Sequence, residues 1–404
     1  MKRRQFIQKS LLATSGTWFI PGFLKAFEQT SLNNHLSNDK ILIVLQLSGG
    51  NDGLNTVIPF RNDLYYEKRP GLSIKPDKLL QITDEIGIHP ALKPLAEIYD
   101  QGWLTILNGV GYPNPDRSHF RAMDIWQTAS SSNQYLQSGW IGRYLDAQCS
   151  AADCATAHDA VEIDDTLSLA LKGEKIKGLA LLNPKKLYQA TQTPQLKALQ
   201  QVANQHPHDD QHSVAYLYKT LAETVSSAGY LYEKSKARES KASYPNTDLG
   251  KRLKTIASLI LSGVQTQVYY ATLAGFDTHV NQAPQQQQLL ETYAEAVRAF
   301  ADDMHQQGQW GRICMLTFSE FGRRVAQNAS GGTDHGSANV AFLMGGSLTQ
   351  AGVYSPVPSL SDLADGDLKY SIDFRNIYAT LLQNHLQAPS SSILGGDFET
   401  LPLC

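Results

Sequence analysis

A short apolar run that ends in a glycine-rich turn constrains the fold of this 404-residue chain more than any other feature. Residues 41–47 are apolar except for Gln46, and the sequence Ser-Gly-Gly-Asn-Asp-Gly follows over residues 48–53. A run of this length, bounded by glycines, is typical of a strand buried on both faces of a parallel sheet. The turn would place Asp52 at the carboxyl end of that strand, where open α/β sheets bind their ligands.

Further apolar strands alternate with amphipathic helices along the rest of the chain. The pattern predicts strands over residues 103–111, 268–273, 313–318 and 338–344, and helices over residues 89–99, 119–128, 249–263, 289–305 and 373–382. This alternation favours a doubly wound, mostly parallel sheet. The 35 basic and 38 acidic residues give no overall positive field, so we expect no nucleic-acid partner.

The amino terminus has the pattern of a targeting segment. The sequence Arg3-Arg4-x-Phe6-x-x-Lys9, followed by a moderately apolar stretch, resembles a twin-arginine export signal, and a basic frayed terminus is the alternative. We therefore expect a signal over residues 1–27, a linker over 28–39 and one domain over 40–404 with elaborations around 150–250. The protein would be periplasmic or secreted, with the twin-arginine translocase as a partner during export.

Carboxylates and imidazoles cluster at the ends of several predicted strands. The candidates, besides Asp52, are Asp277, His279, Glu320, Asp334 and His335. If they meet at one edge of the sheet, their nitrogen and oxygen atoms suit a divalent metal, with zinc first and magnesium, manganese or calcium as alternatives. Each group alone could instead belong to a capping or surface loop, and Glu320 could form a surface ion pair with Arg323 or Arg324.

Ser118 is the candidate nucleophile, because it precedes a predicted helix in a loop that leaves a core strand. A serine there could equally cap the helix. Arg117 and Arg121 flank it and could clamp an anion or lie in solvent. His119 could contact substrate, or pack or cap beside Ser118. Two further substrate-binding candidates are Asn51 and Asn55, although asparagine beside glycine is also ordinary turn chemistry.

Five motifs occur in a fixed order over roughly residues 40–400. They are Gly49-Gly-Asn-Asp-Gly-Leu-Asn55, Arg117-Ser-His-Phe120, Gly275-Phe-Asp-Thr-His279, Ser319-Glu-Phe-Gly-Arg323 and Gly332-Thr-Asp-His-Gly336. Together they resemble the DUF1501 family, an exported bacterial family of uncharacterised function and a branch of the alkaline phosphatase and sulfatase superfamily.

This resemblance implies a three-layer α/β/α sandwich with two metals at the carboxyl edge of its sheet. In that superfamily Asp52 would match the metal-binding aspartate of the first strand, and Ser118 the nucleophile. Asp277 and His279 would belong to one metal site, and His335 would match the last metal-binding histidine. The chain departs from the phosphatase pattern, however, because Ser319-Glu320 replaces an Asp-His pair and the Asp-x-His spacing is shorter. The cysteine motif of sulfatases is also absent, so the number of metals and the hydrolytic competence stay open.

The combined expectation is an exported, metal-dependent hydrolase of phosphate or sulfate esters in which Ser118 attacks an anionic small-molecule or glycan substrate. Arg117 or Arg121 would hold the substrate oxygens, and Glu320 and Asp334 would complete or support the metal shell. The alternative is a non-catalytic envelope binding or assembly protein that retains the hydrolase scaffold and acts with an exported protein partner.

Overall fold

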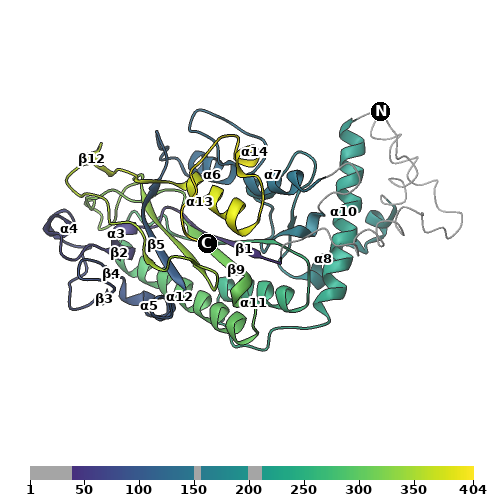
Figure 1. Ribbon diagram of the computed structural model, residues 1–404, viewed down its shortest axis with the longest axis horizontal. Helices are drawn as coiled ribbons and strands as arrows, with labels where there is room; N and C mark the ends of the chain where they lie inside the picture. Colours follow the sequence, from purple (N-terminus) through teal and green to yellow (C-terminus); the bar gives the residue numbers. More distant parts are fainter. Residues whose placement is uncertain (1–38, 150–155, 199–211) are drawn as a thin grey trace, which may run out of the picture.

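The structure is a computed structural model, and it describes residues 39–149, 156–198 and 212–404. It is a three-layer sandwich in which a long central sheet lies between two groups of helices (Figure 1). The predicted signal segment lies outside the described residues. In the described part of the chain, no helix is both long and apolar enough to cross a membrane.

The central sheet is mostly parallel, as predicted. Its strand order is β11-β5-β10-β9-β1-β8-β6-β7, with β14 also paired to β5. The strands are β1 (Ile41–Ser48), β5 (Leu104–Gly111), β6 (Ala160–Glu162), β7 (Leu179–Ala180), β8 (Val268–Ala274), β9 (Ile313–Phe318), β10 (Asn339–Gly345), β11 (Gly352–Val353) and β14 (Ile372–Asp373). Of these strands, β10 alone runs antiparallel to the strands on either side of it, β5 and β9. The reason is that residues 319–338 contain no crossover helix, so the chain turns back at the edge where β9 ends.

Burial on both faces explains the uninterrupted apolar sequence of β1. Ile41, Ile43 and Leu45 point into one hydrophobic core, while Leu42 and Val44 point into the other. Gln46 is tolerated in this setting because its Oε1 accepts a hydrogen bond of 2.6 Å from the Tyr270 hydroxyl. The strand therefore ends at Ser48 with its glycine turn held at the carboxyl edge of the sheet.

Helices cover both faces of the sheet, and one group contributes to each core (Figure 1). The first face carries α5 (Lys93–Asp100), α11 (Asp248–Leu261) and α12 (Gln282–Gln306). The second carries α6 (His119–Thr128), α7 (Trp140–Ala147), α13 (Phe374–Thr380) and α14 (Ser390–Leu394). Helix α12 begins seven residues earlier than predicted, after Asn281 in a left-handed conformation. This earlier start brings Gln282 and Gln286, both buried, towards the turn that follows β1.

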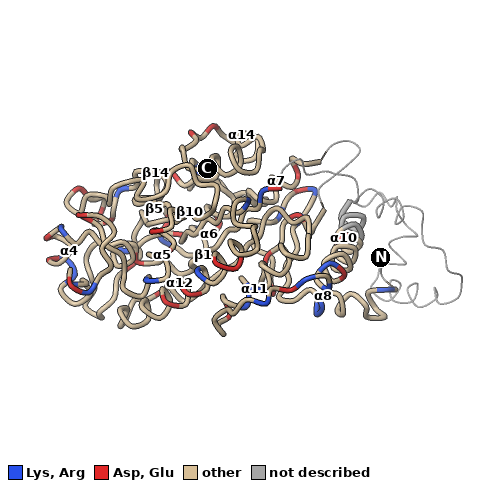
Figure 2. Tube along the Cα trace, turned by 60° about the horizontal axis from the view of Figure 1, so that its bottom comes forward, with Lys and Arg blue, Asp and Glu red and all other residues tan. Residues whose placement is uncertain are grey.

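The remaining elements lie at the two ends of the sandwich (Figure 1). One end holds α3 (Gly53–Thr56), α4 (Asp63–Lys68) and the small sheet of β2 (Val57–Ile58), β3 (Leu80–Gln81) and β4 (Gly87–Ile88). The other holds α8 (Pro184–Thr191) and α10 (His212–Ser235). A two-stranded ribbon pairs β12 (Leu363–Ala364) with β13 (Asp367–Leu368). Along the described chain, basic and acidic residues are interspersed (Figure 2).

Candidate metal centre

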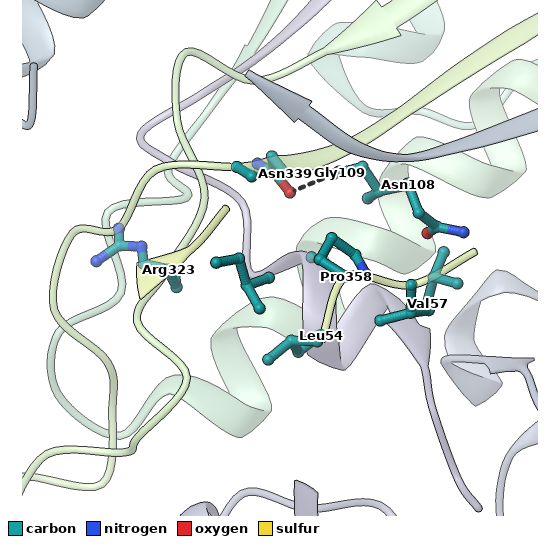
Figure 3. A pocket seen from close by; sticks show the side chains of 12 residues that line it. Leu54, Val57, Asn108, Gly109, Arg323, Asn339 and Pro358 are labelled. Atoms are coloured by element: carbon teal, nitrogen blue, oxygen red, sulfur yellow. Dashed lines mark hydrogen bonds between the residues drawn. The ribbon is translucent and has the colours of Figure 1, made fainter. Parts of the chain in front are cut away.

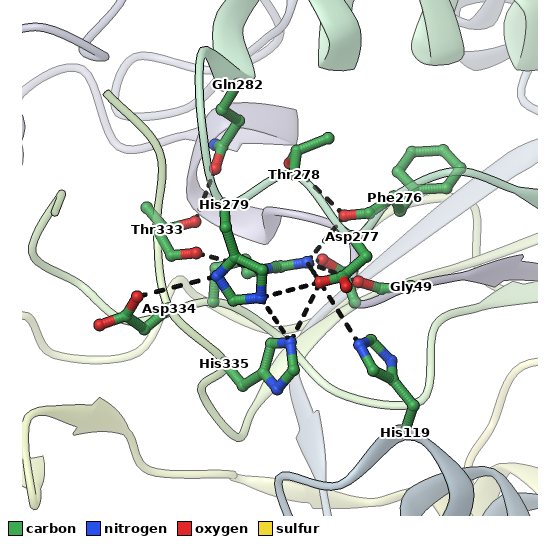
Figure 4. Close-up of polar contacts among 12 residues, drawn as sticks. Gly49, His119, Phe276, Asp277, Thr278, His279, Gln282, Thr333, Asp334 and His335 are labelled. Carbon is green, nitrogen blue, oxygen red and sulfur yellow. Dashed lines mark hydrogen bonds and ion pairs between the residues drawn. The ribbon is translucent and has the colours of Figure 1, made fainter. Parts of the chain in front are cut away.

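Three chain segments meet at the carboxyl edge of the sheet and bring three histidines and one aspartate together (Figure 4). Asp277 and His279 lie in the loop after β8, and His335 lies in the loop before β10. His119 is the first residue of α6, which follows the loop leaving β5. The predicted convergence of strand-end groups thus holds for Asp277, His279 and His335, and it includes His119 as well.

One carboxylate oxygen, Asp277 Oδ1, is the common point of the cluster. It lies 2.9 Å from His279 Nε2, 3.1 Å from His335 Nε2 and 3.3 Å from His119 Nε2. The Nε2 atoms of His279 and His335 are themselves 2.9 Å apart. Ligand atoms that surround zinc tetrahedrally at about 2.0–2.1 Å are roughly 3.3 Å from one another. Asp277, His119 and His335 thus offer ligand atoms within 4.8 Å of one another, and His279 Nε2 adjoins two of them, so these donors lie close to the spacing that a divalent metal requires.

The other ring nitrogen of each histidine faces an oxygen. His335 Nδ1 donates to the backbone carbonyl of Arg117 at 2.8 Å, and His119 Nδ1 lies 3.0 Å from Glu320 Oε1. His279 Nδ1 lies 3.8 Å from Asp334 Oδ1. In neutral imidazoles the first two contacts keep the proton on Nδ1 and leave a lone pair on Nε2, which is how metal-binding histidines are commonly oriented.

His119 Nε2 supplies the most direct test of whether the residues fit a metal. This nitrogen is buried and lies 3.3 Å from Asp277 Oδ1, but it forms no well-aligned hydrogen bond, although Nδ1 of the same ring is bonded to Glu320. Leaving a buried polar atom unpaired costs about 1–3 kcal/mol, so native proteins usually give it a partner. A metal among the three Nε2 atoms and Asp277 would provide that partner, and we conclude that the residues fit one.

The ionisation states support the same conclusion. Burial raises the pKa of Asp277, but hydrogen bonds with His335 and Arg323 outweigh it and bring the pKa to about 2. Burial lowers the pKa of His335. The hydrogen bond with Glu320 raises the pKa of His119, against burial. At neutral pH Asp277 is therefore anionic and His335 neutral, as metal ligands must be, while at His119 a metal competes with a proton that the Glu320 contact stabilises.

Arg323 joins the loops that form the centre. Its side chain is fully buried, and it donates to Asp277 Oδ1 (3.0 Å), to the carbonyls of Gly49 and Gly50 (both 2.6 Å) and to Thr333 (3.0 Å). Gly49 has φ +119°, and a Cβ there would lie 2.4 Å from the Asp277 backbone nitrogen. The glycine turn after β1 is thus required by the close approach of the Asp277 loop.

Glu320 is a support for His119, and the ion pairs considered for it with Arg323 or Arg324 are wrong. Its side chain is fully buried and accepts hydrogen bonds from the Gly49 backbone nitrogen (2.8 Å) and from His119. Asp334 is exposed and lies behind His279. Glu320 faces Nδ1 of His119 and Asp334 faces Nδ1 of His279, so both are placed to support histidines, as one of the two predicted roles has it.

We revise the role predicted for Asp52, because its carboxylate has other partners. Asp52 Oδ2 accepts from Arg69 Nη1 at 2.6 Å and from Gln282 Nε2 at 2.5 Å. The side chains of Asp52 and Arg69 are 1% and 0% exposed, so this is a fully buried ion pair. Asn51 and Asn55 belong to the same interior: Asn51 bonds to Thr56, and Asn55 donates to a backbone carbonyl. Their burial leaves no face of either asparagine open to a substrate.

The two arginines predicted to clamp an anion are also engaged elsewhere. Arg117 forms an ion pair with Asp367, through an Nε contact of 2.8 Å. Arg121 is buried, donates to the carbonyls of Ser131, Ser132 and Gln134, and lies 3.9 Å from the centroid of the Tyr135 ring. It therefore anchors the loop after α6 and does not face the centre.

Ser118 is exposed at the start of α6, and its hydroxyl makes no capping hydrogen bond. The capping alternative for this serine is therefore wrong. Its backbone nitrogen is held by Asp116 Oδ1 at 2.7 Å, which fixes the loop immediately before His119.

A separate small cavity lies between α3, β5 and β10 (Figure 3). Leu54, Val57, Asn108, Pro358 and Asn339 are among the residues that line it, and none of the three clustered histidines does. The candidate metal centre lies outside this cavity and is partly open, since the Asp277 side chain is 49% exposed.

The position of His119 among the ligands and the structural roles of Arg69, Arg323 and Gln282 were not predicted from the sequence. For His119 one sequence feature could have indicated it, because it follows a core strand and its loop, as His279 does. The arginines had none, since their partners are far away in the chain: Arg69 bonds to the carbonyls of Arg324 and Val325.

Comparison with known proteins identifies the family. The family described as "Protein of unknown function (DUF1501)" matches residues 39–395. The chain belongs to this family. Among curated proteins no match is found.

Solved structures with a similar arrangement are distant. They include the lipoteichoic acid synthase LtaP from Listeria monocytogenes (9% identity, 91% of this chain and 77% of that one, TM-score 0.40). A PsFucS1 sulfatase from Pseudoalteromonas sp. matches with 10% identity over 99% of this chain and 75% of that one, TM-score 0.36. A protein in the alkaline phosphatase superfamily from Vibrio parahaemolyticus matches with 10% identity over 90% and 70%, TM-score 0.35.

Proposed function

We propose that this DUF1501 protein is an exported hydrolase of phosphate or sulfate esters that depends on a divalent metal, with zinc as the first candidate. The observation that carries the proposal is the convergence of the His119, His279 and His335 Nε2 atoms on Asp277 Oδ1. Three imidazoles and one carboxylate are a donor set that zinc accepts, with magnesium, manganese or calcium as weaker alternatives.

A bound divalent metal would supply charge neutralisation at an ester oxygen and would lower the pKa of a metal-bound water or hydroxyl. The chain's own residues prepare the site. Glu320 and the Arg117 carbonyl hold protons on Nδ1 of His119 and His335, so that each Nε2 faces inwards. Arg323 fixes Asp277, and the partial exposure of Asp277 leaves the centre accessible to an anionic small molecule or glycan.

Ser118 remains our proposed nucleophile. Its hydroxyl is exposed, is not used in capping, and belongs to the residue next to His119. The backbone amides at the start of α6 favour an anion at this position. Among the residues predicted to bind substrate, no arginine is free for the ester oxygens, so the amides and the metal would carry most of that charge.

The commitment of Arg117 and Arg121 to other partners also favours a second candidate function. In this version the protein keeps the metal centre but binds its anionic or glycan ligand without turnover, as an envelope binding or assembly protein with an exported partner. It predicts ligand binding that depends on metal but produces no product.

Metal content and turnover decide between the two functions. Folded protein purified after export would be assayed for bound metal and for hydrolysis of aryl phosphates and aryl sulfates, alongside Ser118→Ala, His335→Ala and the control Ser361→Ala. We expect metal-dependent turnover that His335→Ala abolishes and Ser118→Ala lowers by at least about 100-fold, the range of a lost nucleophile. Metal without turnover would favour the binding protein, and full activity of Ser118→Ala would remove Ser118 from the mechanism.

We also propose export to the periplasm or beyond by the twin-arginine translocase. The support is the Arg3-Arg4 sequence pattern. Replacing both arginines with lysine should retain the folded protein in the cytoplasm. Unchanged export would contradict this proposal without affecting the metal centre.

A further inference from the structure

Asp52 lies in a cradle of oxygen atoms that is filled by the side chain of Arg69. Arg69 Nη1 donates to Asp52 Oδ2 at 2.6 Å and to Asn55 Oδ1 at 2.8 Å. Its Nε and Nη2 donate to the backbone carbonyls of Val325 and Arg324, both at 2.8 Å. A carboxylate, an amide oxygen and two carbonyls are the ligands that a hard cation takes in proteins. Here they surround a guanidinium.

The hydrogen bonds of this cradle are saturated. Asp52 Oδ2 also accepts from Gln282, and Asn55 Oδ1 also accepts from the Tyr65 hydroxyl at 3.0 Å. Among the buried side-chain atoms without a partner in the described chain, none belongs to these residues or to Arg69, whereas His119 Nε2 is one of them. An ion could enter beside Asp52 only by displacing the Arg69 guanidinium.

The formal charges of the two regions also oppose a second ion beside Asp52. Asp52 and Arg69 cancel each other, while Asp277, Glu320 and Arg323 sum to one negative charge beside the three histidines, which bind a metal only as neutral imidazoles. One divalent ion would make this centre singly positive, which suits an anionic substrate. A second ion close by would add two further positive charges next to two buried guanidinium groups, which like-charge repulsion opposes.

We propose that the chain binds a single divalent ion, at the three-histidine centre, and that Arg69 permanently occupies the place beside Asp52 where the superfamily resemblance implies a second ion. Arg69 is thus a cation supplied by the protein itself. The proposal rests on the proposed function only in taking the three-histidine centre as a metal site.

The test is the metal stoichiometry of the intact protein. Metal-free protein would be equilibrated separately with zinc, magnesium and manganese, and the bound equivalents measured by mass spectrometry and calorimetry. We expect one ion per chain, lost in His335→Ala. Two ions per chain, of which one is lost in Asp52→Asn, would overturn this inference and leave the proposed function standing. No bound ion would overturn both.

Removal of Arg69 tests whether its guanidinium occupies a place that another cation could take. We expect Arg69→Ala to lower the Tm of the metal-free protein by about 5–10 °C, because Asp52 becomes a buried charge without a partner. Low millimolar magnesium, calcium or guanidinium should restore part of that loss, since each can enter the oxygen cradle. The matched control is Arg121→Ala, which removes a buried arginine that donates to three backbone carbonyls, and the Tm of this variant should not respond to divalent ions. Failure of all three cations to restore Arg69→Ala would contradict the role given to Arg69, and if that variant does not fold, the stoichiometry of the unaltered chain decides.

Discussion

The Asp52 cradle and the three-histidine centre use similar acidic groups at the same edge of the sheet, but their states are opposite. In the cradle, Asp52 is buried, paired with Arg69 and surrounded by satisfied hydrogen bonds. In the centre, Asp277 is half exposed, three imidazoles face one of its oxygens, and His119 Nε2 forms no hydrogen bond. Asp52 is closed to a ligand because its carboxylate is buried and already paired within the protein, whereas the half-exposed Asp277 carboxylate can still bind one. The first region stabilises the turn, and the second is available to a ligand.

The largest effect should come from Asp52→Ala in the closed region. Arg69 would become a buried charge without a carboxylate, and we expect the free energy of unfolding of the metal-free protein to fall by about 3–5 kcal/mol. Urea unfolding followed by circular dichroism measures this, and zinc affinity of the folded variant should change by less than about threefold. A variant that keeps its stability but loses zinc would make Asp52 a ligand and abolish the distinction between the regions.

His335→Ala should show the reverse pattern in the open region. We expect zinc affinity to fall on the order of 100- to 1,000-fold, because one of about four ligands is lost. The free energy of unfolding of the metal-free protein should change by less than about 1 kcal/mol, since the side chain is partly exposed. Calorimetric titration with zinc and urea unfolding provide the two numbers, and His305→Ala on α12 is a control histidine outside the centre.

Glu320→Gln should have a smaller effect on the same centre. It keeps the size of a side chain that orients His119 but removes its charge, and such supporting groups change metal affinity by about 10- to 100-fold. Asp334→Asn serves as the matched control, because Asp334 is exposed and lies 3.8 Å from His279, and it should change affinity less. An equal effect of both changes would mean that Glu320 acts only through general electrostatics.

The pH dependence follows from the raised pKa of His119, which the hydrogen bond with Glu320 causes. In the metal-free protein the protonated form is the stabilised one. Its contribution to stability is complete below the ordinary histidine pKa of about 6.5 and is lost as pH rises through the higher folded value. Zinc competes with that proton, so zinc affinity should decline by up to about tenfold per pH unit as pH falls below the folded pKa. Glu320→Gln should move the midpoint of this decline to lower pH, and an unmoved midpoint would exclude His119 as the titrating ligand.

Much of the fold could be predicted because its signals are local. The apolar run of β1 and the helical period of α6 depend on neighbouring residues, and the structure places both where the sequence indicates. The antiparallel direction of β10 was not predicted, since it depends on the absence of a helix between residues 319 and 338. The grouping of strand-end residues into one edge was predictable from topology alone. Which of them stay open was not, because Arg69 and Asp52 meet only through the folding of α4 and the loop around residues 324–325 against the turn.

The most direct test is a crystal structure of the protein grown with zinc, with diffraction data collected on both sides of the zinc absorption edge. The account predicts one strong anomalous peak between Asp277 Oδ1 and the Nε2 atoms of His119, His279 and His335, at about 2.0–2.1 Å from its ligands, with the Asp52–Arg69 ion pair intact. A peak beside Asp52 with Arg69 displaced, or no peak among the three histidines at saturating zinc, would contradict it.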